Sequence, residues 1–74
     1  MRTATAAALI KLRVNGEPVE TAAGTLAELV AAQGFAGMKV ATAVNGAFVP
    51  ARERETTRLA EGDRIEIVSA RQGG

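Results

Sequence analysis

Hydrophobic residues alternate with charged ones in two segments, one near each end of the chain. Residues 10–14 alternate apolar positions with Lys11 and Arg13, and residues 64–70 alternate Ile65 and Ile67 with charged residues. A period of two places successive side chains on opposite faces of a sheet. Each segment is therefore predicted to be a strand with one buried face and one exposed face.

Two Asn-Gly pairs predict tight hairpin turns, because both residue types tolerate positive φ. Asn15-Gly16 returns the chain into residues 17–21, where Pro18 cannot donate a ladder hydrogen bond and indicates an edge strand. Asn45-Gly46 joins residues 38–44 to a short strand at 48–50. Residues 38–44 are apolar or small at nearly every position, which is typical of an inner strand.

A single helix is predicted between these two hairpins. Thr25-Leu26-Ala27-Glu28 matches a capping box, in which the threonine caps backbone amides and the glutamate reaches back. Leu26, Leu29 and Val30 then recur at helical spacing. The helix is expected to extend to about Gln33, with Gly34 as its left-handed cap.

The order of these elements is hairpin, helix, strand, short strand and final strand, which predicts an α+β domain. We expect a β-grasp (ubiquitin-like) fold, with a mixed four- to five-stranded sheet packed on one main helix and the first and last strands parallel at its centre. Residues 1–8 are expected to be a disordered N-terminal extension, 9–70 the β-grasp domain, and 71–74 a flexible diglycine tail. The charged stretch from Arg52 to Arg58 is expected to be a loop or a short helical turn with a solvated face.

Composition narrows the possible chemistry. The 74 residues include no cysteine and no histidine, so the chain has neither a thiolate nucleophile nor an imidazole base, and it lacks the ligands of a typical metal cluster. The net charge is only +1 and no apolar run has the length of a membrane span, which argues against nucleic-acid and membrane partners. We expect a cytoplasmic protein that is not an enzyme and has no metal site.

The last two residues, Gly73-Gly74, are the most unusual chemical feature. Without a Cβ, this pair can thread a narrow channel. A terminal α-carboxyl has a pKa of about 3.5, so it is anionic at neutral pH. Residues 70–74 reach about 17 Å when extended, which is enough to enter a partner's site while the folded body stays outside.

Several of these motifs together resemble the ThiS family, the sulfur carriers of thiamine (thiazole) biosynthesis. They are Val14-Asn15-Gly16-Glu17, the helix start at Thr25-Leu26, Val44-Asn45-Gly46 with Val49-Pro50, and the stretch Glu61 to Val68 that leads to Gly73-Gly74. The resemblance covers residues 9–74. Its most specific part is the Gly-Asp-x-Ile-Glu-Ile-Val stretch of residues 62–68 a few residues before the diglycine.

The resemblance implies a role for the tail. An adenylyltransferase of the ubiquitin-activating (ThiF-like) type would adenylate the carboxylate of Gly74, and a cysteine desulfurase would supply sulfur for a C-terminal thiocarboxylate. A ThiG-like thiazole synthase would then accept the sulfur. The partner uses the ATP, and this chain is expected to bind no cofactor. Gly73 has no side chain that would collide with the wall of the partner's channel. Arg71 and Gln72 would complete the tail.

One surface residue near the tail is a candidate for partner docking. By alternation, Val68 lies on the outer face of the sheet, where it can form an apolar patch with Leu9, Ala41 or Ala43. Three alternatives to the carrier function remain at this point: the small subunit of molybdopterin synthase (MoaD), a covalent protein modifier, and a β-grasp interaction or RNA-binding module with an inert tail.

Overall fold

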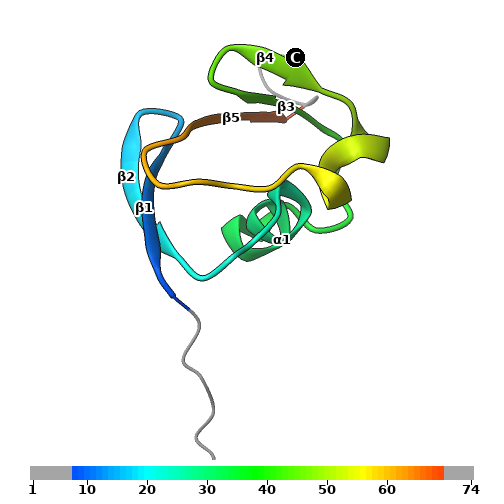
Figure 1. The fold of residues 1–74 in the computed structure, drawn as a ribbon. Helices are drawn as coiled ribbons and strands as arrows, with labels where there is room; N and C mark the ends of the chain where they lie inside the picture. Colours follow the sequence, from blue (N-terminus) through cyan, green and yellow to red (C-terminus); the bar gives the residue numbers. More distant parts are fainter. Residues whose placement is uncertain (1–7, 70–74) are drawn as a thin grey trace, which may run out of the picture.

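The computed structural model describes residues 8–69, which form a five-stranded sheet with one α-helix beneath it (Figure 1). Residues 1–7 and 70–74 lie outside the described part, which therefore excludes the predicted tail and all but the last residue of the predicted N-terminal extension. In chain order the elements are β1 (Ile10–Val14), β2 (Glu17–Thr21), α1 (Leu26–Val30), the π-helical turn η1 (Ala31–Phe35), β3 (Val40–Val44), β4 (Ala47–Val49), the 3-10 helix η2 (Ala51–Thr56) and β5 (Arg64–Ser69).

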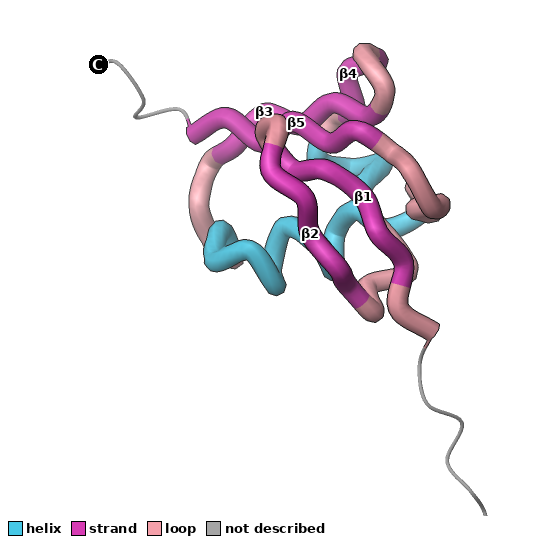
Figure 2. The backbone as a smooth tube through the Cα atoms, turned by 90° about the vertical axis from the view of Figure 1, so that its left-hand side faces the viewer, coloured by secondary structure: helices cyan, strands magenta, loops and turns pink. Residues whose placement is uncertain are grey.

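The strands are ordered β2-β1-β5-β3-β4, so the last strand in sequence is the central strand of the sheet. β1 and β5 are parallel, with Arg13 opposite Arg64 and Val14 opposite Ile65, whereas the other strand pairs are antiparallel. Figure 2 shows β1 and β2 as adjacent strands of one hairpin. The mixed sheet, the parallel first and last strands and the edge position of β2 are all confirmed.

The start of α1 follows the predicted capping box with one difference. Thr25 Oγ1 accepts a hydrogen bond from the Glu28 amide at 3.2 Å, as expected. The Glu28 carboxylate, however, accepts at 2.7 Å from the amide of Gly24, one residue before the cap. Both side chains therefore satisfy backbone donors that a helix N-terminus leaves without partners.

The helical segment extends to the predicted end near Gln33, but its last turn is not α-helical. The α-helix α1 ends at Val30, and the wider π-helical turn η1 continues it. Gly34 has φ 94°, which confirms the left-handed residue at this end. After Gly34 a further turn closes with a 2.9 Å hydrogen bond from the Met38 amide to the Phe35 carbonyl. Because this turn uses Met38, β3 begins at Val40 rather than at residue 38.

The core lies between the sheet and α1. Leu26 and Leu29 of the helix are fully buried, and they meet the inner faces of the strands. The buried apolar residues are Leu12, Val14, Leu26, Leu29, Val30, Val49, Ile65 and Ile67. All of them are aliphatic. The core of this small domain therefore depends on branched side chains at the positions predicted by the strand and helix periodicities of the sequence.

Candidate functional site

The candidate site is the C-terminal end of β5 together with the outer face of the sheet around it. The predicted tail residues Arg71, Gln72, Gly73 and Gly74 lie outside the described residues, so their roles stay predictions. The structure does place the strand that precedes them. The described part of the candidate site consists of β5, the groups that hold it and the surface around its end.

The first Asn-Gly turn holds the C-terminal half of β5. Asn15 has φ 52° and Gly16 has φ 85°, the combination of a type I′ hairpin turn. In this position the Asn15 side chain donates to the Ile67 carbonyl at 3.0 Å and accepts from the Ile67 amide at 2.9 Å. Its amide group thus takes the place of a further β1 residue and extends the parallel ladder beyond the end of β1.

The second Asn-Gly turn holds the beginning of β5 in a similar way. Asn45, also at φ 52°, accepts from the Arg64 amide at 2.9 Å through its side chain and donates to the Asp63 carboxylate at 3.0 Å. The two turns confirm the hairpins predicted from the sequence. That both side chains bind β5 was not predicted, because the turn signal concerns backbone angles and says nothing about a strand distant in sequence.

The outer face around the end of β5 is apolar. Val68 is 52% exposed and lies opposite Ala41 of β3, and Ala43 lies opposite Phe48 of β4. Phe48 is 70% exposed, the largest value among the exposed large hydrophobic residues of the described part. We call Ala41, Ala43, Phe48 and Val68 the outer apolar patch. Phe48 was missed from the sequence, although its alternation with buried Val49 points to it.

The predicted inclusion of Leu9 in this patch was wrong. Arg13 lies opposite Arg64 in the parallel pair of β1 and β5. Leu9 comes four residues before Arg13, and Val68 comes four residues after Arg64. Because the two strands run in the same direction, these residues are at opposite ends of the sheet. Leu9 is exposed, but it lies far from the apolar patch along the strand direction.

A groove of about 530 Å³ adjoins the patch at the same end of the sheet. It is lined by the start of β3, the end of β5 and the first residues of η2, with Met38, Ala41, Val68 and Arg54 among its side chains. Met38 is 43% exposed. The apolar surface at the end of β5 is therefore continuous from the outer patch into this groove.

The charged stretch 52–58 was predicted to be a loop or a short helical turn, and residues 51–56 form the 3-10 helix η2. The prediction that the whole stretch is a solvated face was wrong. Arg54 donates from Nε to Thr42 Oγ1 at 3.0 Å and from a terminal nitrogen to the Val40 carbonyl at 2.6 Å. Thr42, only 2% exposed, in turn donates to the Val49 carbonyl at 2.7 Å. A buried threonine needs such partners, and Arg54 supplies one of them across the groove.

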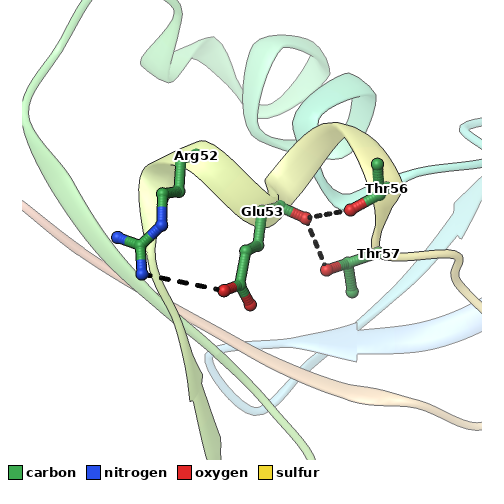
Figure 3. A network of polar contacts seen from close by, with 4 residues as sticks. All are labelled: Arg52, Glu53, Thr56 and Thr57. Carbon is green, nitrogen blue, oxygen red and sulfur yellow. Dashed lines mark hydrogen bonds and ion pairs between the residues drawn. The ribbon is translucent and has the colours of Figure 1, made fainter.

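The other charges of this helical turn remain near the surface. Arg52 and Glu53 form an ion pair at 3.9 Å, with both side chains more than half exposed (Figure 3). The Glu53 carbonyl accepts hydrogen bonds from the hydroxyls of Thr56 and Thr57 at 3.2 and 2.7 Å (Figure 3). These contacts close the end of η2, so their role is local.

Within residues 8–69, no three His, Cys, Asp or Glu side chains come together in a way that could hold a metal ion. None of the helices in this range has the length and apolar content of a membrane span.

Comparison with known proteins identifies the family. The family model described as "ThiS family" matches residues 12–74. The structure resembles that of the thiamine biosynthesis protein ThiS from Geobacter metallireducens, with a TM-score of 0.72 and 28% sequence identity over 88% of this chain and 100% of that one. No curated protein sequence matched the chain. Because the family model covers most of the chain, including β5 and the diglycine, the chain belongs to the ThiS family.

Proposed function

We propose that this chain is a sulfur carrier for thiamine biosynthesis, and that the α-carboxylate of Gly74 is the group that carries the sulfur. The observation that supports this best is the family match, which extends through Gly73-Gly74. The fold adds a physical reason. β5, the strand that leads into the tail, is the central strand and is held by both Asn-Gly turns, so the tail extends from a rigid base.

The carboxylate needs activation before it can receive sulfur. As an anion it attacks the α-phosphorus of ATP, the bond to pyrophosphate breaks, and an acyl-adenylate forms. The terminal sulfur of a cysteine persulfide then attacks the acyl carbon and AMP leaves. A thiol reduces the resulting S–S bond and releases the C-terminal thiocarboxylate. Gly73 keeps the path of the tail free of a side chain, and Arg71 and Gln72 connect it to the folded domain.

The catalytic groups in this scheme belong to the partners. A ThiF-like adenylyltransferase binds the ATP, a cysteine desulfurase supplies the persulfide, and a ThiG-like thiazole synthase accepts the sulfur. The carrier itself is not an enzyme and binds no cofactor, since its sequence offers no histidine or cysteine for acid-base or nucleophilic work. We place it in the cytoplasm, where the ATP for the first step is available.

Partner docking is assigned to the outer apolar patch, which includes the predicted residues Val68, Ala41 and Ala43, together with Phe48. Val68 and Phe48 expose apolar surface that a partner would remove from water. The patch lies at the end of β5 from which the tail continues. A partner seated on the patch would therefore have the tail within reach of its own ATP site.

Intact mass after incubation with ATP, a ThiF-type adenylyltransferase, a cysteine desulfurase and cysteine tests the proposal. Exchange of one oxygen for sulfur adds about 16 Da, and fragmentation should localise the change to Gly74. A variant lacking Gly74 keeps the folded domain and should show no shift. A wild-type chain that is never modified under these conditions would refute the carrier function and favour an interaction module with an inert tail. Isopeptide-linked conjugates in cell extract would instead indicate a protein modifier.

A further inference from the structure

Two arginines lie side by side on the outer face of the sheet. Arg13 of β1 and Arg64 of β5 are directly opposite each other in the parallel pair. Both are exposed, and both alternate with residues of the buried face. Two like charges at neighbouring positions on one face of a sheet repel each other. The pairing of β1 with β5 therefore places two positive charges close together on the outer face.

Within residues 8–69, neither arginine forms an ion pair with a carboxylate, because the only ion pair in that range joins Arg52 and Glu53. The Arg13 guanidinium donates to the Gly16 carbonyl at 3.0 Å, which fixes its position beside the first turn. The carboxylate of Glu66, the next outward-facing residue of β5, forms no ion pair with either arginine.

Both arginines line a hollow that is open to solvent. It measures about 320 Å³ and also includes Gly16 and Gly46 of the two Asn-Gly turns. Its lining residues are Arg13, Gly16, Gly46, Arg64, Ile65 and Glu66. Guanidinium groups present several N–H donors in a plane, a geometry that suits a carboxylate.

The hollow adjoins the outer apolar patch. Along β5 the outward-facing residues are Arg64, Glu66 and Val68, so one strand joins the arginine pair to the patch. Glu66 lies opposite Ala43, which in turn lies opposite Phe48. The outer face is thus cationic at the start of β5 and apolar at its end. A partner surface that complements this face therefore has an acidic group beside an apolar area.

We propose that the Arg13–Arg64 pair receives an acidic side chain of the adenylyltransferase that activates the tail. This inference rests on the proposed function and specifies the chemistry of the partner's docking surface. A carboxylate between the two guanidinium groups relieves their repulsion only in the complex, and so contributes to the affinity for the partner. It also fixes the orientation of the carrier, because the patch alone is non-directional. A free phosphate or carboxylate ion fits the pair less well, since it makes no use of the adjoining apolar surface.

The test measures the KM and kcat of a purified ThiF-type adenylyltransferase for the full-length carrier, by pyrophosphate release at saturating ATP. Arg13→Glu and Arg64→Glu should each raise the KM about tenfold, with kcat within about twofold, because the tail is unaltered. Arg52→Glu reverses the same charge on η2, away from the pair, and should leave the KM within about twofold. Raising NaCl from about 50 to about 300 mM should increase the KM of wild type more than that of the double variant.

Stability provides a second readout that a structural role for the arginines would not produce. Arg13→Glu places an opposite charge beside Arg64 but loses the exposed hydrogen bond to the Gly16 carbonyl, so its Tm should stay within about 3 °C of wild type while its KM rises. The proposal is overturned if both glutamate variants keep the wild-type KM, or if Arg52→Glu raises it equally. It is also overturned if a titration with inorganic phosphate shifts the NMR signals of both guanidinium groups to a plateau at millimolar concentration without changing the KM. That result would indicate a small-anion site. Lack of any turnover with wild type would instead refute the carrier function itself.

Discussion

Replacement of Asn15 by glycine should destabilise the domain by about 2 kcal/mol. Glycine adopts φ 52° without steric cost, so the turn itself is retained, and the entropic cost of a glycine is shared by the matched variant Asn45→Gly. The loss is two hydrogen bonds to the backbone of Ile67, at 3.0 and 2.9 Å, and each contributes about 1 kcal/mol. A domain of this length has a free energy of unfolding of about 4–11 kcal/mol, so the effect is readily measured.

Urea unfolding of the wild type, Asn15→Gly and Asn45→Gly compares how much the two asparagine side chains contribute to the free energy of unfolding. Asn45 also makes two side-chain hydrogen bonds, to the Arg64 amide of β5 and to the Asp63 carboxylate just before it. Both are exposed, so water replaces them and the loss should be about 1 kcal/mol or less. Hydrogen exchange adds a local measurement. In Asn15→Gly the Ile67 amide should lose its protection, whereas the Arg13 amide, which donates to the Asp63 carbonyl at 3.0 Å, should remain protected.

Equal destabilisation by the two glycine variants would refute this reasoning. So would an Ile67 amide that stays protected in Asn15→Gly, since it would mean that another group holds the end of β5. Either result would remove the physical basis for a rigid strand in front of the tail.

Three further changes have definite expected outcomes. Leu29→Ala, at a fully buried helix position, should cost about 2–5 kcal/mol in urea unfolding, and a cost below about 1 kcal/mol would contradict the assigned core. Arg54→Met keeps the stem but loses the hydrogen bonds to Thr42 and Val40, so thermal unfolding should show a loss of about 1–2 kcal/mol; an unchanged Tm would mean that solvent already competes for them. Phe48→Ser should change stability by less than about 0.5 kcal/mol because Phe48 is 70% exposed, yet raise the KM of the adenylyltransferase for the carrier; an unchanged KM would exclude Phe48 from the docking surface.

The elements of the fold were predictable because each has a local signal. Alternation predicts β1 and β5, the Asn-Gly pairs predict both hairpins, and the capping box predicts the start of α1. The details that were not predicted lie where backbone geometry changes within one turn. The α-helix gives way to a π-helical turn before Gly34, and the turn at Met38 delays the start of β3. Periodicity over a long window does not detect either change.

The surface around the end of β5 was only partly predictable. Alternation placed Val68 on the outer face correctly, but assigning its neighbours requires the pairing register, which the sequence does not contain. For this reason Leu9 was included wrongly and Phe48 was missed. The prediction that Arg54 lies on a solvated face was wrong for a related reason. An arginine in a charged run looks exposed, and only the tertiary structure brings it to the buried hydroxyl of Thr42.

The parallel pairing of β1 with β5 also determines how the domain resists mechanical force. Tension applied between Ile10 and Ser69 pulls two neighbouring parallel strands in opposite directions. The ladder bonds, and the two bonds from Asn15 to Ile67, are then loaded together in shear instead of being opened one after another. A machine that grips the chain beyond β5 and pulls, such as an unfoldase that feeds a protease, therefore meets its greatest resistance at the first strand that it reaches.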